Sequence, residues 1–120
     1  MRTIEIIIMY VKGYLTNEYL IQWVRDHEEQ LSKAYYGLYT LVIRTNYKDE
    51  KQVEELKMKL KEMMKESYYY NKTYDMINDS YIVRAMREGK IEDSLIMDMK
   101  KKRSKLLWWT RRNANEVYRI

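Results

Sequence analysis

Residues 3–11 read Thr-Ile-Glu-Ile-Ile-Ile-Met-Tyr-Val, and this stretch decides which fold the sequence predicts. At a spacing of two, its even-numbered residues share one face and its odd-numbered residues the other, and both faces are mostly apolar. Isoleucine recurs through the run, which favours extended structure. We therefore expect a strand buried on both faces and bounded by Gly13. A short buried helix is the alternative, because so brief a run does not distinguish the two.

The following segment has the spacing of an amphipathic helix over about 17–35. Thr16 or Asn17 is the expected N-cap, and Glu18 lies in the first turn, where an acid suits the helix dipole. Gly37 is the expected end of this helix. Its apolar stripe recurs at steps of three and four and is widened by aromatic residues: Leu20, Val24, His27, Leu31 and Ala34, with Tyr19, Trp23 and Tyr35.

The middle of the chain predicts a second strand and a second helix. The strand is expected from Leu38 to Thr45, where side chains of one face alternate with those of the other. Asp49 then opens a helix over about 50–67. The tyrosine-rich stretch 68–77 is interpreted as a third strand or a loop, and its periodicity does not choose between them. The apolar stripe of the helix runs through Val53, Leu56, Leu60, Met63 and Met64.

Two short helices are expected near the carboxyl end. Asp79 or Ser80 caps the first, which runs to Glu88 and stops at Gly89. Asp93 caps the second, which begins at Ser94. The brief Gly-Lys-Ile connection between them is typical of two antiparallel helices, with Ile91 packed just before the second cap.

Taken together, these elements predict an α+β fold with a small sheet. One domain spans 1–120: a mixed β-α-β-α part over 1–67, then a basic antiparallel helical hairpin over 79–112. Two parallel strands do not form a stable sheet alone. A third strand at 68–77 would complete the sheet, or a homodimer would complete it across two copies.

Composition excludes most catalytic chemistry. The 120 residues contain no cysteine, one histidine and 3 glycines, with a net charge of +5. Cysteine-ligated metals, thiol nucleophiles, two-histidine metal sites and glycine-rich phosphate loops are therefore absent from this sequence. His27 lies between Asp26 and Glu28, yet on a helix these neighbours flank it rather than face it. We expect no enzyme, no cofactor and no metal.

No membrane or secretion segment is expected. The early apolar run Ile6–Val11 is far shorter than the roughly 20 residues that a membrane-spanning helix needs. No cleavage pattern of a signal peptide follows it. We therefore expect an intracellular, cytoplasmic protein that does not associate with membranes.

The segment 99–112 carries the strongest functional signal. It reads Met-Lys-Lys-Lys-Arg-Ser-Lys-Leu-Leu-Trp-Trp-Thr-Arg-Arg and has seven basic residues and no acid. Four consecutive cations on a helix point in directions about 100° apart, so no buried face can take them all. At least one of the two tryptophans is expected in the core, with the other at the surface beside the cations. The alternative is that both tryptophans are core residues and the lysine run is only a solvated face. The candidate binding residues here are Lys100, Lys101, Lys102, Arg103, Lys105, Trp108, Trp109, Arg111 and Arg112.

Two further groups are candidates for the same role. Arg84 and Arg87 lie one helical turn apart and could together hold a phosphate or a carboxylate, although an ordinary solvated face explains them too. Tyr70 and Lys72 would share one face of a strand at 68–77, where tyrosines could stack on bases or enter a partner's groove. Because the chain has no phenylalanine, packing in the core is the alternative for these tyrosines.

Two functions remain as hypotheses. The first is a non-enzymatic protein that docks its basic, tryptophan-bearing helix on a protein or nucleoprotein partner and modulates it. The second is a protein that binds single-stranded DNA or RNA directly with the same surface. The bias toward Lys, Tyr, Ile and Met without Pro or Cys resembles proteins of AT-rich phages and mobile elements, and this resemblance assigns no function. An inhibitor from a phage or mobile element is one form that the first hypothesis takes.

Overall fold

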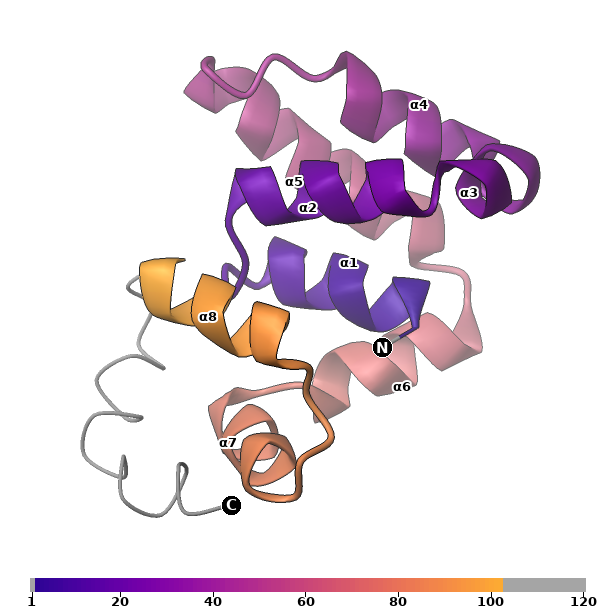
Figure 1. Ribbon diagram of the computed structural model, residues 1–120. Coiled ribbons are helices and arrows are strands. Elements are labelled where there is room, and N and C mark those ends of the chain that lie inside the picture. The colour runs from indigo at the N-terminus through magenta and orange to yellow at the C-terminus, as the bar shows by residue number, and fades with distance from the viewer. Residues whose placement is uncertain (1, 103–120) are drawn as a thin grey trace.

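A computed structural model describes residues 2–102, and this part of the chain folds into helices connected by short turns (Figure 1). It contains no strand between residues 2 and 102. The helices are α1 (Thr3–Val11), α2 (Asn17–Asp26), α3 (Glu28–Ala34), α4 (Tyr36–Arg44), α5 (Glu50–Met64), α6 (Tyr68–Met76), α7 (Asp79–Arg87) and α8 (Asp93–Lys102).

Helix α1 is the centre of the fold. It packs against α2, α5 and α6, and Figure 1 shows it between α2 on one side and α6 and α8 on the other. The five consecutive residues Ile6–Tyr10 are all buried. A helix enclosed by other helices buries every side of its surface, so its sequence is apolar all round.

The expected α+β fold is therefore wrong, and the reason lies in residues 3–11. A strand buried on both faces and a helix buried on all sides give the same apolar run. The helix-propensity deficit of isoleucine is only a few tenths of a kcal/mol, whereas full burial stabilises by about 1.5–3 kcal/mol per large side chain. A helix also pairs its own backbone groups, whereas a strand needs a neighbour that this chain does not form within 2–102.

The second and third expected strands are helices as well. In α4 the buried residues are Leu38 and Val42, four positions apart, rather than every second residue. In α6 the buried residues are Tyr70 and Thr73, followed by Ile77 directly after the helix. Spacings of three and four residues are those of one face of a helix. The Ser67 hydroxyl caps α6, because it accepts a hydrogen bond from the amide of Tyr70 at 3.2 Å.

The expected helix over 17–35 is present as two helices. Thr16 is the N-cap of α2, as predicted, but the backbone leaves helical geometry at His27, with φ −113° and ψ 21°. The chain restarts there as α3. Gly37 does not end this segment, because it lies in the first turn of α4.

The later helices follow the sequence signals more closely. Helix α5 ends at Met64, and its expected N-cap is confirmed because the Asp49 carboxylate accepts a hydrogen bond from the amide of Lys51 at 3.0 Å. Helix α7 is capped by Asn78, one residue before the expected position. Gly89, with φ +68°, follows α7 where glycine tolerates a left-handed backbone. Figure 1 shows α7 almost end-on while α8 lies across the view, so these two helices do not lie antiparallel. The rest of the predicted hairpin, 103–112, falls outside the described residues.

Lys12 connects the carboxyl end of α1 to the carboxyl end of α6 through hydrogen bonds. Its ammonium donates hydrogen bonds to the backbone carbonyls of Tyr74 and Ile77. It also lies 4.2 Å from the centre of the Tyr74 ring. A cation suits this place, because the last carbonyls of a helix lack partners and carry partial negative charge.

Asp98 fastens α8 to the start of α2. Its carboxylate accepts hydrogen bonds from the Thr16 amide at 2.9 Å and from the Thr16 hydroxyl at 2.5 Å. The same hydroxyl accepts a bond from the Tyr19 amide at 3.1 Å, so one side chain serves both contacts. Asp98 is 7% exposed, although aspartate is seldom buried unless it is paired. Within residues 2–102, no helix is long and apolar enough to traverse a bilayer.

We predict that Asp98→Asn destabilises the fold. An amide retains only one acceptor oxygen, so its NH₂ group would face a Thr16 donor, and hydrogen bonds to charged groups are worth about 1.5–3 kcal/mol. Urea unfolding followed by circular dichroism should show a loss of about 2 kcal/mol. The matched control is Asp93→Asn in the exposed first turn of α8, where only the helix dipole is affected, by about 0.5 kcal/mol. Equal effects of the two changes would contradict the prediction.

Candidate partner-binding surface

The expected basic surface lies mostly beyond the described residues. Lys100 and Lys101 are exposed on α8, whereas the preceding Met99 is buried. Helix α8 continues to Lys102. The other members of the predicted set fall outside the described residues: Arg103, Lys105, Trp108, Trp109, Arg111 and Arg112.

Arg84 and Arg87 are both exposed on α7, as predicted for a solvent-facing pair. The opposite side of α7 is buried. Lys90 does not join them, because its ammonium pairs with the Glu88 carboxylate at 2.8 Å. This ion pair lowers the pKa of Glu88 and raises the pKa of Lys90 relative to their ordinary values. The charge of Lys90 is thus already balanced by a carboxylate.

Tyr70 and Lys72 do not form a shared face. Two residues apart on a helix point about 200° apart, so burying one exposes the other. Tyr70 is 1% exposed and packs in the core, whereas Lys72 is exposed. The row of stacking tyrosines expected for a strand at 68–77 therefore does not exist.

His27 is engaged in the fold itself. Its ring stacks on the Trp23 ring with centroids 4.1 Å apart, and its Nδ1 lies 2.7 Å from the Trp23 carbonyl oxygen. These contacts hold the imidazole at the break between α2 and α3. Among the described residues, no group of three or more histidine, aspartate or glutamate side chains is arranged to hold a metal ion.

A cluster of exposed tyrosines and a methionine lies where four helices end. We call it the tyrosine–methionine surface: Tyr35, Tyr36, Met63, Tyr68 and Tyr69, exposed by 38%, 64%, 53%, 80% and 42%. Its members come from the α3–α4 junction, the end of α5 and the start of α6, which meet at one edge of the molecule in Figure 1. Tyrosine and methionine are enriched in protein interfaces, and singly exposed apolar residues are far commoner than such a cluster.

A cavity of about 410 Å³ opens within this surface, in the size range of ligand-binding pockets. None of its lining residues is charged. Gly37 forms part of the wall, and a Cβ placed there would lie 3.2 Å from the Met63 Cε atom, so a larger residue would narrow the cavity. The lining is Ile4, Ala34, Tyr35, Tyr36, Gly37, Leu38, Met63, Met64, Ser67 and Tyr70.

A second cavity of about 450 Å³ adjoins the first and shares Ile4 and Tyr35 with it. Its distinguishing residue is Arg2. The guanidinium donates a hydrogen bond to the Tyr69 hydroxyl at 3.0 Å and lies 5.9 Å from the Tyr69 ring centre. No carboxylate lines this cavity; its other residues are Thr3, Trp23, His27 and Gln30.

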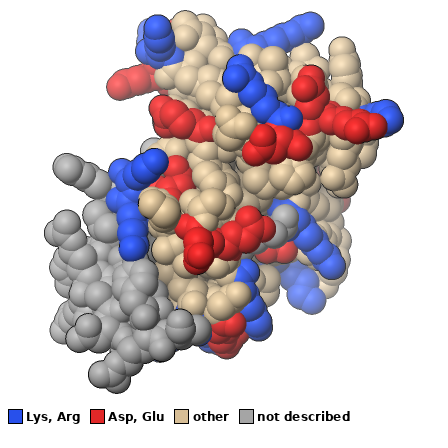
Figure 2. Space-filling model, in the orientation of Figure 1, with Lys and Arg blue, Asp and Glu red and all other residues tan. Residues whose placement is uncertain are grey.

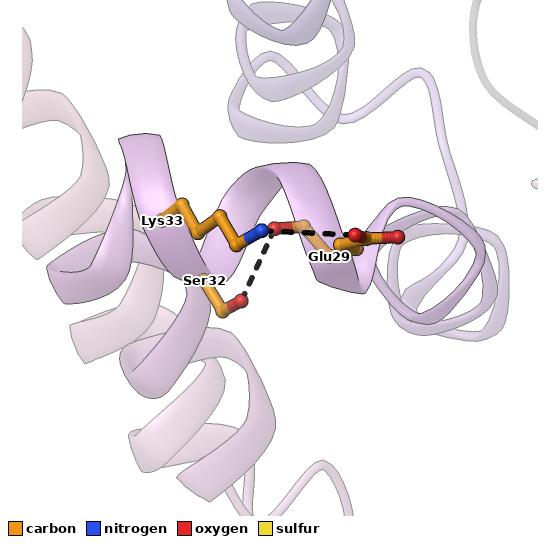
Figure 3. A network of polar contacts seen from close by, with 3 residues as sticks. All are labelled: Glu29, Ser32 and Lys33. Carbon is orange, nitrogen blue, oxygen red and sulfur yellow. Dashed lines mark hydrogen bonds and ion pairs between the residues drawn. The ribbon is translucent and has the colours of Figure 1, made fainter.

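Charge elsewhere on the described part is balanced. Figure 2 shows Lys and Arg interspersed with Asp and Glu over the face drawn. On α3, Glu29 pairs with Lys33 at 3.6 Å, and Ser32 donates to the Glu29 carbonyl at 3.3 Å (Figure 3). Both charged side chains are highly exposed, and such pairs contribute at most about 1 kcal/mol. Of the 23 basic residues, five lie in 103–120 beside a single acid, so four of the five net charges belong there.

Sequence reasoning missed the tyrosine–methionine surface because it placed Tyr35 and Met63 on buried stripes. The available signal was the width of those stripes. Leu56, Leu60 and Met64 follow one another at steps of four, which leaves Met63 about 100° away from Met64. A stripe that includes both is wider than one packed face needs.

Comparisons of this chain with protein-family models, with curated proteins and with solved structures found no match. Its function is therefore inferred from its own residues and their arrangement.

One buried polar atom below the first cavity leads to a stability prediction. The Tyr70 hydroxyl is buried and has no hydrogen-bond partner among the described residues. Burial raises the pKa of Tyr70 to about 12. A buried hydroxyl without a partner costs about 1–3 kcal/mol, so Tyr70→Phe should stabilise the protein by about 1 kcal/mol in urea unfolding.

The control is Tyr10→Phe. Tyr10 is equally buried, but its hydroxyl donates to Asn17 Oδ1 at 2.7 Å. Losing this bond should destabilise the protein by about 1 kcal/mol. The two identical chemical changes are thus expected to have opposite signs, and a loss of stability in both would refute the assignment of an unpartnered Tyr70 hydroxyl.

Proposed function

We propose that this protein is a binding protein without catalytic activity that docks on a protein or nucleoprotein partner and modulates it. The observation that supports this most is the tyrosine–methionine surface. Tyr36, Met63 and Tyr68 are more than half exposed. Tyr36 and Met63 line a cavity that has no charged residue in its wall. Exposed apolar clusters around a hollow are characteristic of surfaces that other molecules cover.

The basic segment 99–112 supports a second contact with the same partner. It holds seven cations and no acid, while residues 2–102 are close to neutral. In Figure 1 the carboxyl end of α8, from which this segment continues, lies at the edge opposite the tyrosine–methionine surface.

The proposal assigns no catalysis because of the chemistry that the sequence provides. The chain has no cysteine, and its single histidine stacks on Trp23 and contacts the Trp23 carbonyl. The remaining candidate acids and bases are ordinary members of helices, such as Glu54 and Glu55 on α5. Binding is the activity that these residues support best.

The test is affinity capture with the tagged full-length chain from a lysate of its own cells, with and without nuclease. We predict that wild type captures a specific protein and that the double variant Tyr36→Ser, Met63→Ser loses it by more than fivefold, as expected when residues worth over 1 kcal/mol are removed. Circular dichroism would verify that both chains are folded. Light scattering of the purified chain distinguishes self-association from capture of a different protein.

The matched control is Met58→Ser. Met58 is on the same helix as Met63 and is 69% exposed, but it does not line the cavity. It should leave capture unchanged. Recovery of nucleic acid with no protein, or a protein captured equally by the double variant, would refute docking through this surface.

Direct binding of single-stranded nucleic acid is the second candidate, favoured by the charge of 99–112. A labelled single-stranded oligonucleotide should then bind at low salt, and its affinity should fall steeply as salt is added. For each phosphate contact, the logarithm of the binding constant should fall by about 0.7 per tenfold rise in salt concentration. The triple variant Lys100→Glu, Lys101→Glu, Lys102→Glu should abolish binding, whereas Tyr36→Ser, Met63→Ser should not. No polarisation change at about 50 mM salt would exclude this function.

A further inference from the structure

We infer that the two adjoining cavities receive a segment of a partner protein in which a large apolar side chain stands next to an acidic residue. This inference rests on the proposed function and specifies the chemistry of the partner. It follows from what lines each cavity, from the way the cavities join, and from the exposed side chains around them.

The first cavity fits an apolar anchor. Its volume of about 410 Å³ is ample for one aromatic side chain with part of its backbone, and its lining has no charge. Met63 and Met64 form part of the wall, and methionine adapts its shape to the side chain that it meets. A charged group placed here would lose its hydration without a partner of opposite charge.

The second cavity fits a carboxylate. Arg2 is exposed, and its guanidinium donates a hydrogen bond to the Tyr69 hydroxyl, which carries no charge. The lining of this cavity includes no acid. A guanidinium held on a tyrosine ring is already ordered, so less freedom is lost when a carboxylate binds to it.

The two cavities join at Ile4 and Tyr35, which line both. An occupant of the first cavity therefore has the second as its immediate neighbour. Successive residues of one peptide suit this arrangement when the backbone is helical or turned, since neighbouring side chains then diverge by about 100° and one can enter each cavity. The order of apolar and acidic residues along the peptide is not fixed by this geometry.

The exposed rim favours a protein over a small molecule as the source of this chemistry. Tyr36 and Tyr68 are 64% and 80% exposed, and Tyr68 lines neither cavity. A ligand confined to the cavities would leave these rings in water, whereas a protein surface around the inserted segment would cover them. Tyrosine at the rim of a filled pocket is typical of protein interfaces.

The Tyr70 hydroxyl is excluded from direct contact with the occupant. Although Tyr70 lines the first cavity, its oxygen is almost inaccessible, so the side chain acts as wall. Tyr70→Phe preserves that wall.

The experiment titrates three probes into the full-length protein: N-acetyl-Trp-Glu-amide, N-acetyl-Trp-Gln-amide and N-acetyl-Trp-Lys-amide. Binding is followed by NMR of methionine and isoleucine methyl groups. We expect the signals of Met63, Met64 and Ile4 to shift, while Met97 on α8, 61% exposed, serves as a reference that does not. The Glu probe should bind about threefold more tightly than the Gln probe, and the Lys probe most weakly.

Variants separate the two cavities. Arg2→Gln should make the Glu and Gln probes equal while leaving the Gln probe unchanged. Gly37→Leu should weaken all three probes at least fivefold, because its side chain would extend toward Met63 and occupy the apolar cavity. Leucine is a good helix former, so α4 should persist. Met58→Ser should bind the probes as wild type does, because Met58 lines neither cavity.

The inference is overturned if no probe shifts Met63 and Met64, if the three probes bind equally, or if Gly37→Leu binds as wild type. These outcomes leave the proposed function standing wherever the tyrosine–methionine surface still captures a protein partner. Light scattering that shows a dimer lost in Tyr36→Ser, Met63→Ser, with no probe bound, would identify a second copy as the occupant and also overturn it.

Discussion

Burial of α1 on all sides over Ile6–Tyr10 is the constraint on which the rest of this structure depends. Five consecutive side chains, Ile6–Tyr10, must leave water, and no two-sided arrangement of neighbours hides a helix on every side. Helices α2, α5 and α6 therefore pack around it. Lys12 fixes its carboxyl end to α6, which leaves its amino end, with Arg2 and Ile4, among the ends of the surrounding helices. The candidate binding surface is thus a consequence of how the central helix is enclosed.

The sequence predicted the solvated helices well and the buried ones badly, for a physical reason. Helix α5 has a one-sided stripe and a capping Asp49, and both survive in the structure. Residues 3–11 have no polar face, so the period that separates helix from strand is missing from them. In α4 the apolar residues are dense enough to satisfy both periods, and burial of Leu38 and Val42 selected the helical one. Isoleucine-rich composition then tilted the prediction toward strands, although tertiary packing outweighs propensity.

The site was harder to predict than the fold because tyrosine serves opposite purposes in this chain. With 13 tyrosines and no phenylalanine, residue type does not separate core from surface. Neighbours at 68, 69 and 70 show this: Tyr68 is 80% exposed, whereas Tyr70 is 1% exposed with its hydroxyl unpartnered. Only the start of α6 at Ser67 decides which tyrosine faces outward, and that start was not evident from the pattern. The exposed basic residues of α7 and α8 were predictable because charge has only one favourable environment.

In the proposed binding mode, the basic segment 99–112 and the tyrosine–methionine surface have different physical roles. The near-neutral described part carries the tyrosine–methionine surface, whose contacts depend on shape and desolvation and change little with salt. The cations of 99–112 act over about 8–10 Å at physiological salt, so they speed encounter with an acidic partner more than they define it. Since Arg2 adds one local charge beside an apolar cavity, specificity for a partner is expected to reside in these two cavities and the tyrosine–methionine surface around them. If the proposal holds, different residues control association rate and selectivity. Substitutions in 99–112 should then change the association rate, and substitutions in the tyrosine–methionine surface should change the lifetime of the complex.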